Sequence, residues 1–350
     1  MPVPHHEVCI VTDAAFRAHE ALGAHPERPA RLDAASRGRV ASAAACIDIP
    51  ARRASLEELT RVHDERYIDE LQAALAGGRG HLDPDTFFGP GTGEAAWRAA
   101  GGACAMVDAL LDRGVRRGAL LARPPGHHAT PTRAMGFCLL NNIAVAAAHA
   151  RARGVGRVAI VDWDVHHGNG TQEAFEADPS VLFVSLHRAP FYPGTGRNDE
   201  VGRGEGRGRT VNVPLPASTG GRTYRAVFEQ IVLPVVEEFA PDLLLVSAGF
   251  DSHERDPLGG MQLATSDFAW MAAQLCDRTG APDRPVGLVL EGGYDLRAIE
   301  DCVAATLDAL SGLRIEDARS AAREQPPGQP EQAAIDRAIE AQRPYWRGAV

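Results

Sequence analysis

Short apolar runs alternate with longer helical patterns along most of this chain, and this alternation restricts its fold more than any other feature. The predicted strands are Val8–Val11, Gly118–Ala122, Val158–Val161, Val181–Leu186, Thr210–Val213, Leu243–Ser247 and Val286–Leu290. The predicted helices are Pro29–Ala45, Asp64–Ala76, Thr92–Arg116, Asn141–Arg153, Arg222–Phe239, Thr265–Asp277 and Asp295–Leu310. Several strands are apolar on both faces, as in a parallel sheet that helices cover. The pattern predicts a doubly wound α/β fold with one mainly parallel sheet.

The same pattern runs through the chain without an internal repeat, so we expect one domain over residues 1–350 with a core at about 19–312. Residues 313–350 are more polar and contain the proline-bearing stretch EQPPGQPEQ. We interpret them as an appendage of the same domain that ends in a helix near Gln332–Gln342. The segment Gly194–Arg209 is rich in glycine and arginine and is expected to be a loop.

Composition narrows the class of protein. The formal net charge is -10 and the chain has no basic run, which argues against direct binding of nucleic acid. No window approaches the roughly eighteen apolar residues of a membrane span, and the start MPVPHHEVCIVTD lacks the pattern of a signal peptide. The six cysteines are scattered without a CxxC pair, which is typical of reduced thiols. We therefore expect a cytoplasmic enzyme, and the sequence gives no expectation for its oligomeric state.

Polar side chains follow four of the predicted strands at the point where each strand ends. They are His127 and His128, the run Asp162–Asn169, Asp251, and the run Glu291–Tyr294. In open parallel sheets, binding sites form beyond the carboxyl ends of the strands. The sequence therefore predicts that these side chains converge on one site.

A metal site is predicted from three of these residues. Asp164 and His166 are two positions apart, so in extended backbone both side chains point the same way. With Asp251 they make three protein ligands with open positions, the arrangement of catalytic zinc. Two carboxylates are unusual for zinc, so Fe(II) or another divalent ion remains an alternative. An isolated Asp-x-His pair is more often structural; the other strand ends favour the metal.

Proton-transfer groups are predicted beside this metal. An isolated His-His pair is more often a cap or part of a core, but His127 and His128 follow a rigid Pro-Pro-Gly turn. Asp162 and Asn169 flank the metal motif and are suited to orient the two imidazoles. Tyr294 follows two glycines, which let its phenol approach the site.

Seven motifs in order then resemble the histone deacetylase family, in its class II-like bacterial form; acetylpolyamine amidohydrolases belong to the same superfamily. The motifs are HPERPARL (His25–Leu32), RPPGHHA (Arg123–Ala129), GFCLLNNIAVAA (Gly136–Ala147), VDWDVHHGNGTQ (Val161–Gln172), VSLHR (Val184–Arg188), SAGFDSHERDPLGG (Ser247–Gly260) and LEGGYDL (Leu290–Leu296). The resemblance extends from about His19 to Leu310. It implies the arginase/deacetylase-like fold, a single domain with an eight-stranded, mainly parallel sheet flanked by helices.

The resemblance also implies a role for each residue of the site. Asp164, His166 and Asp251 would hold Zn²⁺, His128 would be general base and then acid, and Tyr294 would stabilise the oxyanion. His127 would be an electrostatic partner oriented by Asp162, and Asn169 would orient His128, where some relatives have Asp. A structural K⁺ is implied near Asp162, Asp164, His166, Ser185 and Leu186.

The resemblance further implies a narrow tunnel that holds the acyl chain of the substrate, and it assigns four positions to it. Phe137 and Tyr192 would line it, Gly136 would offer its carbonyl to the scissile N–H, and Leu258 stands where one polyamine-selective branch has a glutamate. Arg31 falls where the family has an arginine in an internal cavity behind the metal.

Three functions follow from these features. The first is removal of acetyl or other acyl groups from acyl-lysine in proteins or peptides. The second is deacetylation of small molecules of the acetylpolyamine type, against which Leu258 argues mildly. The third is a non-catalytic module that binds acyl-lysine, which the complete set of ligands and proton-transfer groups disfavours.

Overall fold

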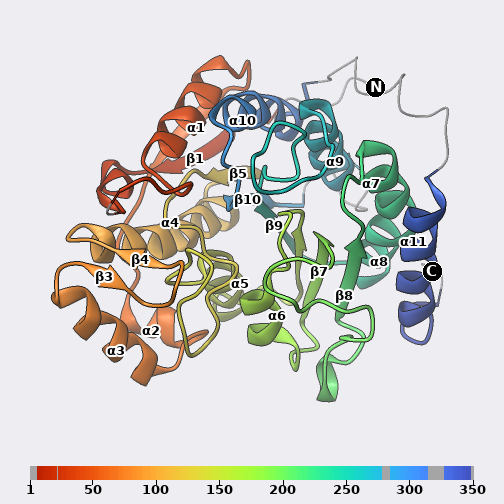
Figure 1. The fold of residues 1–350 in the computed structure, drawn as a ribbon, viewed down its shortest axis with the longest axis horizontal. Coiled ribbons are helices and arrows are strands. Elements are labelled where there is room, and N and C mark those ends of the chain that lie inside the picture. The colour runs from red at the N-terminus through yellow and green to blue at the C-terminus, as the bar shows by residue number, and fades with distance from the viewer. Residues whose placement is uncertain (1–5, 22, 278–283, 314–326, 348–350) are drawn as a thin grey trace.

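The computed structural model describes residues 6–21, 23–277, 284–313 and 327–347. Its main sheet has eight parallel strands in the order β2-β1-β5-β10-β9-β6-β7-β8 (Figure 1). The strands are β1 (Val8–Thr12), β2 (Cys46–Pro50), β5 (Arg117–Leu120), β6 (Val158–Asp162), β7 (Val181–Arg188), β8 (Thr210–Leu215), β9 (Leu243–Ala248) and β10 (Val286–Leu290). The predicted fold class is confirmed.

Helices cover both faces of this sheet, and each face has its own buried apolar core. One core contains side chains of α1 (Ala30–Ala41), α7 (Gly221–Val227), α8 (Leu233–Phe239), α9 (Thr265–Asp277), α10 (Leu296–Leu310) and α11 (Gln329–Gln342). The other contains side chains of α2 (Leu56–Thr60), α3 (Glu65–Ala76), α4 (Thr92–Asp112), α5 (Asn142–Ala152) and α6 (Asn169–Phe175). None of the helices within the described ranges has the length and apolar character that crossing a membrane requires.

Strand β2 lies at the edge of the sheet, directly after the predicted helix Pro29–Ala45, and it was not predicted from the sequence. Helix α1 stops at Ala41, because Ser42 is extended and its hydroxyl donates to Asp308 Oδ1 at 2.6 Å. The backbone N–H groups of Ala43 and Ala44 donate to the same carboxylate oxygen. Ser42 and Asp308 are more than 260 positions apart in the sequence, so no local pattern predicts their contact.

The predicted helix Arg222–Phe239 is interrupted by a π-helical turn at Phe228–Val232. Pro234 follows that turn, and a proline has no N–H to donate and clashes with the carbonyl four residues earlier. The wider turn accommodates it, so α7 and α8 are separate segments.

Two smaller features connect elements of the main fold. A two-stranded antiparallel hairpin, β3 (Gly80–His81) and β4 (Phe87–Phe88), stands outside the main sheet. The segment Gly194–Arg209 is a loop as predicted, with a single short 3₁₀ turn at Gly204–Gly206.

Candidate active site

Asp164, His166 and Asp251 come together beyond the carboxyl ends of neighbouring strands. Strands β6 and β9 are paired, with Asp162 opposite Ser247, so the segments that follow them run side by side. His166 Nδ1 lies 3.1 Å from Asp164 Oδ1 and 3.3 Å from Asp251 Oδ2. One candidate ligand atom from each residue lies within 4.8 Å of the other two.

This group fits a divalent cation. Asp164 and Asp251 are fully buried, and Asp251 Oδ2 makes no hydrogen bond within the part of the chain that the structure describes, although His166 Nδ1 lies 3.3 Å away. Burial and the charge of Asp164 raise the pKa of Asp251 to about 7. Two buried carboxylates that repel one another and leave an oxygen unpaired are what a metal ion compensates. Two carboxylates and one imidazole also leave coordination positions open.

Backbone N–H groups orient both carboxylates. Gly292 donates to Asp164 Oδ2, and Val165 donates to Asp251 Oδ1, each at 2.8 Å. A Cβ at position 292 would lie 2.1 Å from Asp251 Oδ2 and 2.6 Å from Asp164 Oδ2. Only glycine therefore fits between the two carboxylates, which explains the first glycine after Glu291.

The two adjacent histidines have different partners. His127 Nδ1 lies 2.9 Å from Asp162 Oδ2, and His128 Nδ1 lies 2.8 Å from Asn169 Oδ1. Because the Asn169 oxygen can only accept, His128 Nδ1 carries the proton and its Nε2 lone pair is free.

Their electrostatic environments also differ. Burial lowers the pKa of His127, but the charges of Asp164 and Asp162 outweigh it and raise that pKa to about 10. Burial and the charge of His127 hold the pKa of His128 well below its ordinary value. The surroundings of His127 therefore favour its charged form, and those of His128 favour its neutral form.

Glu291 holds the turn that carries this pair, a role that the sequence did not reveal. Its Oε2 accepts from the backbone N–H of Gly126 at 2.6 Å and of His127 at 3.1 Å. Its position at the end of β10 is the one sequence signal that pointed to it.

The sequence also did not reveal the role of Asp256. Its Oδ2 accepts from the backbone N–H of Tyr294 at 2.7 Å, and its Oδ1 accepts from those of Leu258 and Gly259. Asp256 thus fixes Tyr294 relative to the loop that carries Leu258.

Tyr294 lies over a buried ionic network. The Arg31 guanidinium is 5.1 Å from the ring centroid of Tyr294, and Arg31 Nε donates to the Gly293 carbonyl at 2.6 Å. Glu27, fully buried, accepts from Arg31 Nη1 at 2.9 Å and from two nitrogens of Arg123. The position of Arg31 was predicted, whereas the pairing with Glu27 and Arg123 was not.

Aromatic rings surround the approach to the metal group. The rings of Phe137 and Tyr294 are 5.9 Å apart, and those of His128 and Tyr192 are 5.1 Å apart, both edge to face. A Cβ at Gly136 would lie 2.5 Å from His128 Cδ2. Tyr192 and Leu258 are 37% and 38% exposed, as expected of residues at a rim. Tyr294 also borders a pocket of about 430 Å³, whose other lining residues are Gly23, Ala24, His25, Pro26, Arg28 and Pro257.

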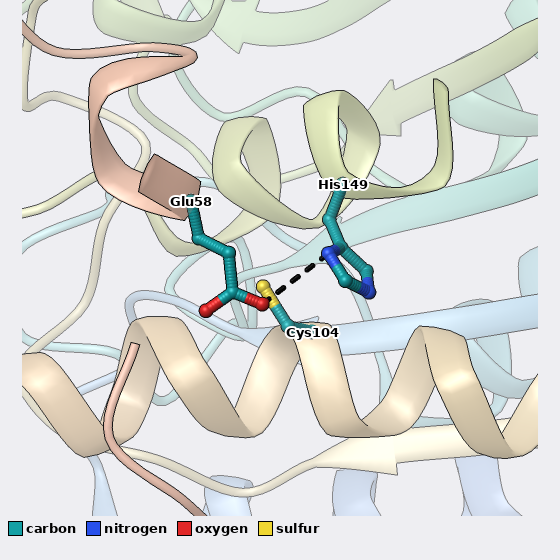
Figure 2. A group of neighbouring side chains, drawn as sticks. All are labelled: Glu58, Cys104 and His149. Carbon is teal, nitrogen blue, oxygen red and sulfur yellow. Dashed lines mark ion pairs between the residues drawn. The ribbon is translucent and has the colours of Figure 1, made fainter. Parts of the chain in front are cut away.

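A second group of potential ligands, Glu58, Cys104 and His149, lies between α2, α4 and α5 (Figure 2). Arg52 donates to both carboxylate oxygens of Glu58, at 2.8 and 2.5 Å. His149 Nε2 pairs with Asp108 Oδ1 at 2.8 Å, and burial raises the pKa of the Cys104 thiol. Since protein groups already compensate these charges, we interpret the cluster as an ion-pair network that joins three helices.

Comparisons with known proteins found a matching family model and related sequences. Residues 25–310 match the model of the Histone deacetylase domain. The chain is 42% identical over 301 residues to histone deacetylase 15 of Arabidopsis thaliana, covering 84% of this chain and 54% of that protein. It is 41% identical over 339 residues to the polyamine deacetylase HDAC10 of Homo sapiens, covering 92% of this chain and 49% of that protein. The chain therefore spans about half the length of these relatives.

A solved structure matches over nearly the whole chain. The crystal structure of the HDA15 HD domain aligns with a TM-score of 0.90 at 36% identity, covering 98% of this chain and 95% of that one. The similarity therefore includes the arrangement of the elements as well as the motifs.

Proposed function

Because this chain belongs to the histone deacetylase family, we propose that it is a deacetylase that hydrolyses acyl-lysine amides, with Zn²⁺ held by Asp164, His166 and Asp251. Fe²⁺ is the alternative ion, since two carboxylates and an imidazole also suit it. When bound, the divalent cation supplies a Lewis acid that polarises the amide carbonyl and acidifies water.

His128 is proposed to move the proton. Its Nε2, free because Nδ1 donates to Asn169, takes a proton from the attacking water and then delivers it to the departing amine. His127, held by Asp162, stays charged and stabilises the negative charge that develops nearby. The single observation that carries this mechanism is the different partner of each imidazole, a carboxylate at His127 and a neutral amide at His128.

Tyr294, Gly136 and the aromatic walls are proposed to hold the substrate. The phenol of Tyr294 donates to the carbonyl oxygen and, more strongly, to the oxyanion that replaces it. The Gly136 carbonyl accepts from the scissile N–H, and Phe137 and Tyr192 exclude water from the acyl chain.

The experiment that tests this function is a product analysis on an acetyl-lysine peptide. Acetate and the free lysine amine are expected in equal amounts, and their rate of formation should be proportional to the enzyme concentration. Absence of both products with metal-loaded protein would reject the function.

Acyl-lysine is preferred over acetylpolyamine because Leu258 gives the rim no negative charge at that position. The alternative has its own support, since a relative at 41% identity is named a polyamine deacetylase. Comparing kcat/KM for an acetyl-lysine peptide with that for acetylputrescine and acetylspermidine decides between them. A higher value for the acetylpolyamines would reverse the preference.

We propose a structural K⁺ beside β6 and β7, around Asp162, Asp164, His166, Ser185 and Leu186. The register that sets Asp162 opposite Ser185 and the burial of Asp162, Asp164 and Ser185 support it. Thermal unfolding in KCl and in choline chloride at equal ionic strength tests it, with a higher Tm expected in KCl. Equal Tm values would reject the ion.

We also propose that residues 1–350 form one domain and that the protein is cytoplasmic. Gln342 donates to the carbonyl of Thr210 on β8, which supports the C-terminal helix as part of the domain. All six cysteines are free, which suits a reducing compartment. Fractionation of the native host's cells would test the location.

A further inference from the structure

The turn Gly136–Phe137 has an unusual backbone for its sequence. Both residues have positive φ, 57° at Gly136 and 67° at Phe137. Met135 and Cys138, on either side, exchange backbone hydrogen bonds at 3.1 and 3.0 Å. Two central residues with positive φ are the signature of a type I′ turn, where the second position normally holds glycine. A phenylalanine adopts this conformation only when its surroundings impose it.

The surroundings that impose it belong to the hairpin β3–β4. The N–H of Gly136 donates to Asp85 Oδ1 at 3.2 Å, and the N–H of Phe137 donates to Thr86 Oγ1 at 3.1 Å. The Thr86 hydroxyl in turn donates to Asp85 Oδ1 at 3.0 Å, so the two acceptors form one unit.

This unit has a rigid base. Asp83 Oδ1 accepts from the N–H groups of Asp85 and Thr86 at 3.0 and 2.7 Å, and Leu82 donates to the Thr86 carbonyl at 2.8 Å. Phe87, on the next strand, stacks on His19 with 4.4 Å between ring centroids. Thr86 itself is fully buried.

Close neighbours leave little room for the Gly136–Phe137 turn to change its backbone conformation. A Cβ at Gly136 would lie 2.5 Å from His128 Cδ2 and 3.0 Å from the hydroxyl of Tyr192. The Phe137 ring also meets His25, with 4.7 Å between centroids, and it faces Tyr294. A change of φ at either residue would therefore move a wall of the acyl tunnel and the carbonyl of Gly136 together.

We propose that Asp85 and Thr86 are positioning residues that lock the Gly136–Phe137 turn and thereby set which acyl chains the tunnel accepts. Neither touches the reacting atoms; both act through the turn. The inference rests on the proposed function, because the tunnel is a substrate site only if the chain hydrolyses acyl amides. If the turn is free to move, the tunnel accepts longer acyl groups, and an acetyl group is held less accurately for reaction.

The test compares variants that remove one acceptor with variants that keep it. Thr86→Val removes the hydroxyl at nearly constant shape, whereas Thr86→Ser keeps it. Asp85→Ala removes the carboxylate at a partly exposed position, and Asp85→Asn keeps an acceptor oxygen. Asp178→Ala is the matched control, since Asp178 Oδ1 also accepts from a backbone N–H and a hydroxyl, both of Ser180. It precedes the amino end of β7, whereas the site lies beyond the carboxyl ends of the strands.

Two readouts are needed, one of them independent of turnover. Hydrogen exchange at the amides of Gly136 and Phe137 reports the lock directly, and we expect their protection to fall about tenfold in Thr86→Val and Asp85→Ala. The ratio of kcat/KM for acetyl-lysine to that for butyryl-lysine is expected to fall about tenfold in the same variants. Thr86→Ser, Asp85→Asn and Asp178→Ala should stay near wild type in both.

Wild-type protection and an unchanged acyl ratio in Asp85→Ala would overturn the inference while leaving the proposed function intact. An equal loss in Asp178→Ala would overturn it as well, because general destabilisation would then explain the effect. A wild-type enzyme without activity on either acyl-lysine would instead overturn the proposed function and the selectivity that rests on it.

Discussion

His127 and His128 are identical side chains, adjacent in the chain, that the protein holds in different electrostatic environments. Asp162 accepts from one and the neutral amide of Asn169 from the other, and this difference separates their pKa values. A pair of titratable groups with separated pKa values lets one act as a base while the other supplies fixed charge. The roles proposed for the two residues follow from this environment.

Replacement of His128 by alanine is expected to lower kcat by a factor of about one hundred to ten thousand, the usual contribution of a general base. Steady-state kinetics on an acetyl-lysine peptide measure it, with Tm and bound metal as controls for an intact fold. Turnover within about tenfold of wild type would contradict the role.

Tyr294→Phe is expected to lower kcat about a hundredfold, because it removes one donor to the oxyanion. The ring would still pack on Arg31, whose guanidinium lies 5.1 Å from its centroid, so stability should not change. KM for the acetyl-lysine peptide should rise less than kcat falls. An unchanged kcat would remove Tyr294 from the mechanism.

At the scale of elements, charged networks join segments that share no sequence pattern. Arg52, Glu58, His149 and Asp108 tie α2, α4 and α5 together beneath one face of the sheet. Burial raises the pKa of Glu58, but hydrogen bonds from Arg52 and the Ser55 backbone outweigh it and lower that pKa to about 2. The network therefore makes stability depend on pH.

The sign of this dependence can be tested with Glu58→Gln. A depressed pKa in the folded state gives stability that is complete above the ordinary value of 4.5 and is lost as the pH falls toward 2. The variant should therefore have a lower free energy of unfolding than wild type at pH 6, and the difference should shrink by pH 3. Urea unfolding of both proteins at the two pH values measures it. A difference that stays constant or grows at low pH would contradict the shift.

At the scale of the whole molecule, the C-terminal helix closes one edge of the sheet. Strand β8 is an edge strand, and α11 packs beside it (Figure 1). Trp346 is buried and lies under the Arg209 guanidinium, 4.9 Å from the ring centroid. An edge covered in this way is protected from pairing with another chain.

Trp346→Ala should lower the free energy of unfolding by about 3 kcal/mol, the usual cost of truncating a buried aromatic side chain. Chemical denaturation that follows a signal from the sheet measures it, with Arg66→Ala, an exposed helix position, as the control. A loss below about 1 kcal/mol would mean that the helix is not part of the cooperative domain.

The sequence predicted the features that repeat or converge along the chain. Seven of the eight strands follow from apolar runs, and the candidate metal ligands and proton-transfer groups follow from polar residues at strand ends. The tunnel positions followed only from the resemblance to a family. Strand β2 and the roles of Asp85, Asp256 and Glu291 could not be predicted in this way. Each depends on contacts between backbone N–H groups and carboxylates distant in sequence, which leave no local pattern.

Metal content measured together with activity tests the central claim most directly, that a divalent cation at Asp164, His166 and Asp251 supports hydrolysis. Wild type should bind about one equivalent, lose turnover of an acetyl-lysine peptide on chelation and regain it when the metal is restored. Asp251→Ala should retain neither metal nor activity. Full turnover by wild type freed of metal, or by Asp251→Ala, would contradict the account.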